Sequence, residues 1–261
     1  MSPKMQPKAL RAQSDPVFVQ SLGKAMRVLE AFRDSDAPLS LAEISSRAGI
    51  TRSAAQRIVH SFRQLGYMRL SDDGRGFLLD LGILDLTYNY LRMHPLIRRA
   101  TPILQELRRT VRERVDLSLF DGQRMVYAAR LQSKREVFFA TLIGHSVPTY
   151  CTSGGWAVLA MLPDDEVNML LSAAEMRQVT PRTLTDPQAI REQIELTRQN
   201  GHSLAIEQIL MGEVAIGVAI SGSDNRPAGA IHIAGNLSEW QPEEFRRHVA
   251  PLASAAASAM I

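Results

Sequence analysis

Cysteine and long apolar runs are both scarce in this sequence. The single cysteine, Cys151, rules out a disulfide within the chain and disfavours a structural zinc site built from thiolates. No run of about 18 apolar residues is present, and the first twenty residues alternate basic, polar and small groups where a signal peptide would have an apolar core. We therefore expect a cytoplasmic protein with no membrane span and no membrane partner.

Acidic residues are missing from one stretch near the N-terminus. None lies between Glu43 and Asp72, and the same stretch holds five arginines. Residues 1–114 carry 19 Lys and Arg against 11 Asp and Glu, a net charge of +8; residues 115–261 carry 11 against 16, a net charge of −5, and the two sum to +3. Nucleic-acid-binding proteins segregate basic charge in this way, because phosphate contacts supply affinity. A merely solvated basic surface is the alternative.

The length of 261 residues exceeds the usual size of one domain, so two domains of unequal size are expected. Residues 1–17 lack apolar periodicity and predict a flexible basic arm. A first helix is expected to start with Ser21 as its N-cap, and its apolar residues keep helical spacing as far as Phe32.

The next two helices form a helix-turn-helix pattern. Ser40 and Glu43 form a capping box that starts one helix, and Gly49 can take the left-handed conformation that ends it. Thr51 is placed as the N-cap of the following helix, which stops at Gly66. Two helices joined by a tight glycine turn are the unit that places its second helix in the major groove of DNA.

The second helix of this pair is amphipathic. Its inner face is expected to hold Ala54 or Ala55 with Ile58, Phe62 and Leu65, and its outer face is hydrogen-bonding, with Arg52, Ser53, Gln56, Arg57, His60 and Gln64. Residues 67–79 predict a hairpin with a turn at 71–76, which would form a wing. The predicted contacts with double-stranded DNA are Thr51, Arg52, Ser53, Gln56, Arg57 and His60 on the helix and Arg75 at the wing tip. An exposed turn arginine without a role is the alternative for Arg75.

The remaining sequence predicts an α+β domain. Helical spacing occupies residues 81–94 and 96–114, on either side of Pro95. Strands are expected at 115–120, 125–130, 137–142, 203–210, 213–221 and 227–234, and helices at 154–172, 187–200 and 242–260. Residues 18–80 would thus form a winged helix-turn-helix domain, 81–95 a linker helix, and 96–261 a second domain. The apolar stripe of the linker suits either its own domain or a second subunit.

The order of these features resembles the IclR family of transcription regulators over residues 18–258. The matching segments are Val28 to Phe32, Leu41 to Ile44, Ser53 and Arg57, then Gly144 and Pro148 as a Gly-x-x-x-Pro stretch, Thr152 with Gly155, Ala157, Leu159 and Ala160, and Thr180, Thr183, Gly201, Glu207 and Gly212. Trp156 stands where the family usually has a lysine. The resemblance implies a winged helix-turn-helix joined by a linker helix to a GAF-like antiparallel-sheet domain, acting as a homodimer or homotetramer on palindromic operators.

The resemblance also implies that the second domain binds a small organic acid as effector. Members that hold small oxo acids place acidic, Cys and Ser side chains where this chain has Ala205 or Ile206, Ala215, His232 and Ala234, so a larger, partly aromatic or apolar acid is expected. The glycine-rich stretch 144–155 runs into a helix start, whose N–H groups suit a carboxylate; close helix packing is the alternative use of its glycines. The expected effector-binding residues are Gly144, His145, Tyr150, Cys151, Thr152, Ser153, Ala205, Ala215, His232 and Ala234.

No catalytic residue, cofactor or metal site is predicted. Cys151 has no nearby histidine signature, Ser153 lacks the Gly-x-Ser-x-Gly pattern, and no two histidines have metal-site spacing. The sequence therefore predicts a ligand-responsive, DNA-binding transcriptional regulator. Two alternatives remain: an enzyme that turns over a small acid in the second domain, and a winged-helix module that binds a protein partner.

Overall fold

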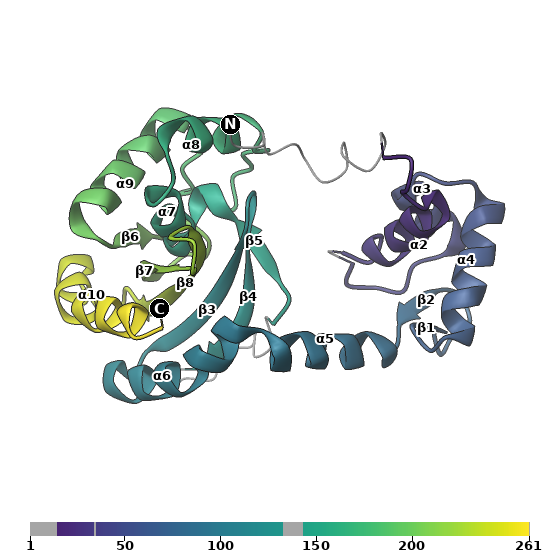
Figure 1. Cartoon of the computed structure of the whole chain (residues 1–261), viewed down its shortest axis with the longest axis horizontal. Helices are drawn as coiled ribbons and strands as arrows, with labels where there is room; N and C mark the ends of the chain where they lie inside the picture. The colour runs from purple at the N-terminus through teal and green to yellow at the C-terminus, as the bar shows by residue number, and fades with distance from the viewer. Residues whose placement is uncertain (1–14, 34, 133–142, 261) are drawn as a thin grey trace. The chain divides into compact units, whose positions relative to one another are not determined.

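The computed structural model describes residues 15–33, 35–132 and 143–260. The chain separates into two compact units, Met1–Tyr90 and Leu91–Ile261 (Figure 1). Most of the expected basic arm, and the strand expected at 137–142, lie outside the described residues. No helix in the described ranges is both long and apolar enough to cross a membrane.

The first unit combines three helices with a hairpin: α2 (Gln20–Glu30), α3 (Leu41–Ala48), α4 (Arg52–Gln64), β1 (Met68–Leu70) and β2 (Phe77–Leu79). The predicted capping box is confirmed, because Ser40 Oγ accepts from the Glu43 N–H at 3.3 Å and Glu43 Oε2 accepts from the Ser40 N–H at 2.8 Å. Gly49 ends α3 in the left-handed region at φ +61°. Thr51 caps α4 as predicted, since its Oγ1 accepts from the Ala54 N–H at 3.3 Å.

The start of α2 differs from the prediction. The helix begins at Gln20, and Ser21 lies inside its first turn, so Ser21 is not the N-cap. Val19 occupies that position with an extended backbone, and its carbonyl accepts the first helical bond from the Gly23 N–H at 3.1 Å. The Phe18 ring lies so close to Gly23 that a Cβ there would come within 2.8 Å of it. Apolar packing before the helix therefore sets its start, not a polar side chain.

The inner face of α4 differs from the prediction at its C-terminal end. Ala55 and Val59 are buried at 0% and 2% exposure against the other helices, and Ile58 and Phe62 are half-buried. Leu65, which was expected on this face, is 66% exposed. Leu65 is the C-cap and follows the last helical residue, so helical spacing no longer directs its side chain toward the core. Val59 is the apolar side chain of α4 that is buried there instead.

The hairpin is the predicted wing. Strands β1 and β2 are antiparallel, with Arg69 opposite Leu78, and Gly74 turns the connection at φ +71°. Leu39 forms a bridge with Phe77, through N–H to carbonyl bonds of 3.0 and 2.8 Å in both directions. The segment before α3 is thus tied to the wing, which holds the wing beside the helices.

The second unit contains a six-stranded antiparallel sheet with the order β5-β4-β3-β8-β7-β6. Its strands are β3 (Arg114–Asp121), β4 (Arg124–Leu131), β5 (Ser146–Pro148), β6 (Ser203–Ile206), β7 (Glu213–Ser221) and β8 (Pro227–Asn236). Its helices are α6 (Pro95–Val111), which follows α5 (Gly82–Met93), then α7 (Ser153–Ala160), α8 (Asp164–Ser172), α9 (Pro187–Asn200) and α10 (Pro242–Ser258). The single helix predicted over 154–172 is two helices, and β5 was not predicted.

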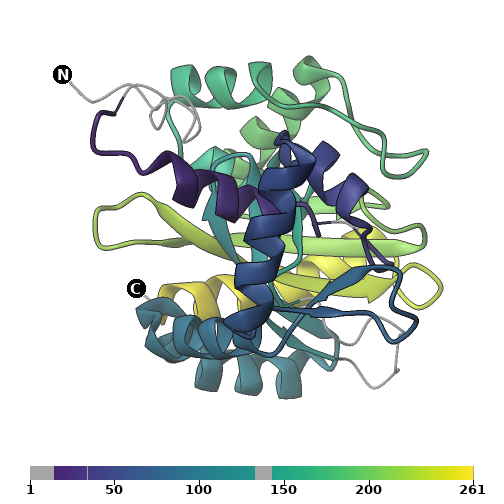
Figure 2. The ribbon, with the colours of Figure 1, turned by 90° about the vertical axis from the view of Figure 1, so that its right-hand side faces the viewer.

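Helices cover both faces of this sheet (Figure 1, Figure 2). On one face α6 and α10 bury an apolar core that includes Leu104, Val115, Ile231 and Phe245. On the other face α7, α8 and α9 bury a second core around Trp156. Because side chains alternate along a strand, the residues between the apolar positions of β3 and β8 point toward α7. Several of these are polar, and they form the floor of the site described next.

Candidate nucleic-acid interface and ligand cavity

The outer face of α4 is open to solvent. All seven residues predicted to contact DNA are exposed: Thr51, Arg52, Ser53, Gln56, Arg57, His60 and Arg75. A groove beside α4 is lined by Leu41, Gln56, Arg57, Val59, His60, Ser61, Arg63 and Phe77. The polar edge of the helix and the wing strand β2 therefore border the same depression.

The five arginines of the acid-free stretch have two different uses. Arg47 donates to the Ala31 carbonyl at 3.1 Å, and Arg69 pairs with Asp72 at 3.1 Å, so these two stabilise the unit itself. The side chains of the other three form no hydrogen bond or ion pair with any described residue: Arg52, Arg57 and Arg63. All three project from α4, which leaves that helix with cations available for a partner.

The wing tip carries charges of both signs. Asp73 Oδ1 accepts from Ser71 Oγ at 2.6 Å and from the Arg75 N–H at 3.1 Å, and these bonds lower the pKa of its carboxyl. Asp72 lies beside it. Arg75 thus stands on a turn that also carries two carboxylates, which makes its surroundings less favourable to phosphate than those of the α4 arginines.

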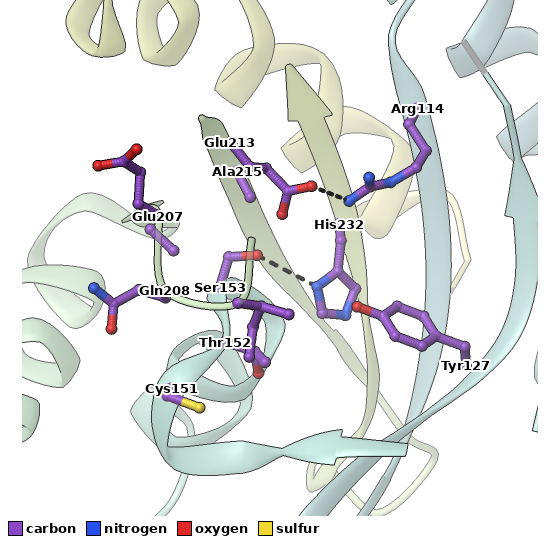
Figure 3. A pocket seen from close by; sticks show the side chains of 12 residues that line it. Arg114, Tyr127, Cys151, Thr152, Ser153, Glu207, Gln208, Glu213, Ala215 and His232 are labelled. Atoms are coloured by element: carbon purple, nitrogen blue, oxygen red, sulfur yellow. Dashed lines mark hydrogen bonds and ion pairs between the residues drawn. The ribbon is translucent and has the colours of Figure 1, made fainter. Parts of the chain in front are cut away.

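A cavity opens between the start of α7 and the sheet of the second unit (Figure 3). It is small in this structure, with about 20 Å³ of space for the centre of a water molecule, and it continues into open solvent. Its lining residues are Arg114, Tyr127, Cys151, Thr152, Ser153, Ala205, Glu207, Gln208, Ile209, Glu213, Ala215 and His232. Six of the ten residues predicted to bind the effector therefore meet at one place, although they come from four separate parts of the chain.

The other four predicted effector residues do not line this cavity. Gly144 and His145 are exposed, and the His145 carbonyl accepts from the Tyr127 N–H at 2.9 Å. The Tyr150 hydroxyl is satisfied within the protein, because it donates to the Arg177 carbonyl at 2.6 Å and accepts from the Arg177 N–H at 2.8 Å. Ala234 is buried on the same sheet face but lies beyond the lining residues.

His232 joins the sheet to the start of α7. It is 4% exposed; its Nδ1 lies 3.3 Å from the Gly154 N–H, which donates to it, and its Nε2 lies 2.6 Å from Ser118 Oγ. Because Nδ1 accepts, the ring proton is on Nε2 and is donated to Ser118. Burial lowers the pKa of His232 to about 4, with Asp116 opposing the shift. The imidazole is therefore neutral near pH 7 and acts as a fixed hydrogen-bonding group.

The glycines at the start of α7 are needed for close packing. A Cβ on Gly154 would lie 2.2 Å from His232 Cε1, and a Cβ on Gly155 would lie 1.9 Å from the Thr149 carbonyl oxygen. Their N–H groups are also engaged, the first by His232 and the second by Thr152 Oγ1 at 3.0 Å. The packing role of these glycines is thus visible in the contacts, and a bound anion would need donors from elsewhere in the cavity.

The sequence-based prediction did not include the buried charged residues at the cavity. Arg114 pairs with Glu213 at 2.7 Å and with Asp116 at 3.1 Å, and Arg130 pairs with Asp116 at 2.7 Å. Burial opposes the charge of Arg114, but the attraction of Glu213 and then Asp116 outweighs it and raises its pKa. Asp116 is 1% exposed. The available signal was the alternation of charged and apolar residues at the start of β3, which places these charges on one sheet face.

Tyr127 presents an unused donor to the cavity. Its side chain is 7% exposed, and its hydroxyl forms no hydrogen bond with any described residue. The Arg130 guanidinium carbon lies over the Tyr127 ring, 5.1 Å from the ring centroid. The centroids of the Tyr127 and His232 rings are 5.6 Å apart. Figure 3 shows the hydroxyl directed toward His232. Tyr127 lines the cavity, so its hydroxyl is available to hydrogen-bond a ligand or water there.

Residues 207–209 form one wall of the cavity, and two threonine hydroxyls behind this wall hydrogen-bond to its backbone. Thr180 Oγ1 donates to the Glu207 carbonyl at 2.5 Å, and Thr183 Oγ1 donates to the Gln208 carbonyl at 2.7 Å. Glu207 has a left-handed backbone at φ +54°, which redirects the chain after β6. Both threonines match the family pattern noted in the sequence, and their contacts explain their positions.

Cys151 lies at the cavity as a neutral thiol. It is fully buried, and burial raises its pKa to about 12. The thiolate required for nucleophilic chemistry is therefore scarce near pH 7. In the ranges that the structure describes, no three His, Cys, Asp or Glu side chains gather as a metal site.

Comparisons with known proteins agree on one family. Residues 21–71 match the IclR helix-turn-helix domain, and residues 88–260 match the family described as bacterial transcriptional regulator IclR C-terminal. The chain is 29% identical over 243 residues to the Pca regulon regulatory protein of Pseudomonas putida, covering 93% of this chain and 83% of that protein. It is 26% identical to the p-hydroxybenzoate hydroxylase transcriptional activator of Acinetobacter baylyi, covering 90% and 88%.

The fold is shared with solved structures. An IclR homolog complexed with 4-hydroxybenzoate, from Microbacterium hydrocarbonoxydans, superposes with a TM-score of 0.75 at 23% identity, covering 92% of this chain and 97% of that one. The matched families and relatives are transcription regulators, which sets aside the enzyme alternative. With both of its units matched, this chain belongs to the IclR family of transcription regulators and combines a helix-turn-helix with an effector-binding domain.

Proposed function

We propose that this regulator binds a palindromic double-stranded DNA operator through the exposed face of α4, as a homodimer or homotetramer in the cytoplasm. Its effector is a small organic acid, with an aromatic acid as the favoured candidate. The observation that carries the DNA assignment is the set of three arginines on α4 without a partner among the described residues. Cations without internal partners suit a polyanion, because they lose no ion pair when they bind phosphate.

The residues of α4 divide by their chemistry. Arg52 and Arg57 supply charge and can bind guanine edges or phosphates, and Gln56 can bind an adenine edge in the major groove. Thr51 and Ser53 lie at the helix start, where backbone N–H groups favour phosphate. His60 extends the contact along the helix, and Arg75 is proposed to reach a phosphate from the wing.

Fluorescence anisotropy on DNA from upstream of the gene for this protein tests the interface. We expect Arg52→Ala with Arg57→Ala to weaken binding roughly 30-fold or more, because each lost contact is worth about 1 kcal/mol or more. The slope of log affinity against log salt should fall in magnitude by about 2. Arg177→Ala with Arg182→Ala is a charge-matched control, since these side chains are exposed on the second unit. Equal binding by both double variants would refute the assignment.

Exposed apolar side chains on and before α5 support an oligomer. Leu81, Leu84 and Leu86 are 70%, 62% and 56% exposed. Apolar residues gathered on one helix usually meet a partner surface. We expect Leu84→Glu to lower the sedimentation coefficient to that of a smaller species, whereas Met169→Glu, at a site 41% exposed in the other unit, should not. An unchanged coefficient for Leu84→Glu would remove α5 from the interface.

The cavity of the second unit supports the effector assignment. Arg114 and the free hydroxyl of Tyr127 are donors to an acid, and Ala205, Ala215 and Ile209 give it an apolar wall. Two relatives, one named for p-hydroxybenzoate hydroxylase and one bound to 4-hydroxybenzoate, favour an aromatic acid. Arg114 also follows α6 by three residues in sequence, and α6 follows α5. A ligand that contacts Arg114 in one conformation better than in another would therefore shift the balance between DNA-binding states.

Two tyrosines provide a matched test with 4-hydroxybenzoate as the probe. Tyr127→Phe removes a hydroxyl without an internal partner, so we expect affinity measured by calorimetry to fall about 2- to 10-fold. Tyr150→Phe removes a hydroxyl that is satisfied inside the protein and should leave affinity unchanged. If neither 4-hydroxybenzoate nor any other organic acid in a thermal-shift panel stabilises the protein, the organic-acid assignment fails.

A further inference from the structure

The cavity of the second unit carries more acid than base. Its charged lining residues are Arg114, Glu207 and Glu213, and its histidine is neutral, so the lining has a net charge of −1. The ion pair beneath it, Asp116 with Arg130, adds nothing to this balance, and Arg182 neutralises Glu207 from outside the lining at 3.8 Å. A simple carboxylate would therefore enter a site that has no excess positive charge to offer it.

The only lining cation is already shared. Arg114 lies 2.7 Å from Glu213 and 3.1 Å from Asp116, and Figure 3 shows its guanidinium directed at the Glu213 carboxylate. An acid that bound Arg114 alone would compete with Glu213 and push a second carboxylate out of its ion pair. That exchange gives little net stabilisation unless the ligand also offers something to Glu213.

The two glutamates differ in whether they have an oxygen to spare. Glu213 uses Oε2 for Arg114, and its Oε1 receives no hydrogen bond from any described residue. Glu207 Oε1 accepts from the Gly212 N–H at 2.8 Å and its Oε2 pairs with Arg182 Nε at 3.8 Å, and Figure 3 shows its carboxylate directed away from Arg114 and His232. Both side chains are mostly buried, at 16% and 18% exposure. Partly buried carboxylate oxygens without donors are strong acceptors, and they penalise a ligand that brings no donor.

We infer that the effector carries a hydrogen-bond donor, a hydroxyl or an ammonium group, together with its acidic group, and that Glu213 selects for that donor. The class of ligand is therefore hydroxy acids or amino acids, and simple acids are rejected. Arg114 and the Tyr127 hydroxyl serve the acidic group, while Glu213 Oε1 serves the donor. This inference rests on the proposed function, because it places the effector in this cavity.

Matched pairs of acids test the inference by calorimetry on the full-length protein. The pairs are 4-hydroxybenzoate with benzoate, lactate with propionate, and 4-(aminomethyl)benzoate with 4-methylbenzoate. We expect the donor-bearing member of the pair that binds to have at least tenfold higher affinity than its partner. Equal affinity within every binding pair would overturn the inference and leave the proposed effector site standing. If no acid binds, the organic-acid part of the proposed function falls, and the inference falls with it.

A charge-neutral variant identifies the selecting residue. Glu213→Gln brings the lining charge from −1 to zero and releases Arg114, so the simple acid should bind more tightly and the ratio within the pair should fall at least threefold. Glu192→Gln makes the same change in net charge on the exposed side of α9 and should preserve the ratio. Glu207→Gln is a second control and should preserve the ratio, because its carboxylate is held by the Gly212 N–H and by Arg182. An unchanged ratio in Glu213→Gln would overturn the role of Glu213.

Discussion

The arginines of the two units differ in one respect that separates their roles. On α4 of the first unit, Arg52, Arg57 and Arg63 are exposed and have no partner among the described residues. At the cavity of the second unit, Arg114 and Arg130 are mostly buried, at 19% and 6% exposure, and share the carboxylate of Asp116. Exposed cations keep their hydration until a polyanion arrives, so they cost little stability and depend on salt. Buried cations require partners, so they contribute to the fold itself.

The largest expected effect comes from breaking the buried set. Asp116→Asn removes the charge that holds both Arg114 and Arg130, so the free energy of unfolding should fall by about 3–5 kcal/mol. Both tryptophans, Trp156 and Trp240, lie in the second unit, so urea unfolding followed by tryptophan fluorescence reports on that unit. A loss below about 1 kcal/mol would mean that the arginines do not depend on Asp116.

The next effect is a loss of stability in acid that involves His232. The pKa of His232 is about 4 in the folded protein, against an ordinary value of 6.5. Between pH 4 and 6.5 this histidine therefore binds a proton more readily in the unfolded chain than in the folded one. The stability contributed by neutral His232 is therefore complete above pH 6.5 and declines as the pH falls toward 4, by up to about 3 kcal/mol.

A variant separates this contribution from that of the carboxylates. His232→Asn cannot take up the proton, so its unfolding free energy should decline less than that of the natural chain over the same pH range. Urea unfolding at pH 7, 6, 5 and 4 measures both curves. Parallel curves would show that His232 does not titrate in this window and that other groups cause the loss.

The smallest expected effect is on the stability of the first unit. Arg52→Ala and Arg57→Ala should each change its unfolding free energy by no more than about 0.5 kcal/mol, because neither side chain has an internal partner. Thermal melting followed by circular dichroism checks this, and the same proteins serve in the DNA-binding assay. A large destabilisation would show that these arginines support the fold, and the contrast between the two units would then fail.

Local signals in the sequence were sufficient to predict where most helices of the first unit start and end. Ser40 with Glu43, Gly49 and Thr51 act on backbone groups within four residues of themselves, so their roles can be predicted without knowing the fold. Ser21 was misassigned because the contact of Phe18 with Gly23 set the helix start instead. The error at Leu65 arose because a periodic pattern does not itself show where the helix stops.

The cavity could be predicted only in part. The sequence located the start of α7 and three positions on the late strands, because the family pattern marks them. It did not connect Arg114 with Glu213, which are 99 residues apart and meet only through the register of β3, β8 and β7. It also predicted that Tyr150 binds the ligand. In the fold, the Tyr150 hydroxyl is hydrogen-bonded to Arg177, and it is the Tyr127 hydroxyl that has no partner among the described residues.

By itself, the sequence determined the helix-turn-helix, its polar outer face and the family, because capping, periodicity and charge are properties of neighbouring residues. Only the tertiary structure decided which arginines are free and which are paired, and which polar groups face the cavity. Pairing across a sheet depends on strand order and register, and these follow from the packing of the whole second unit.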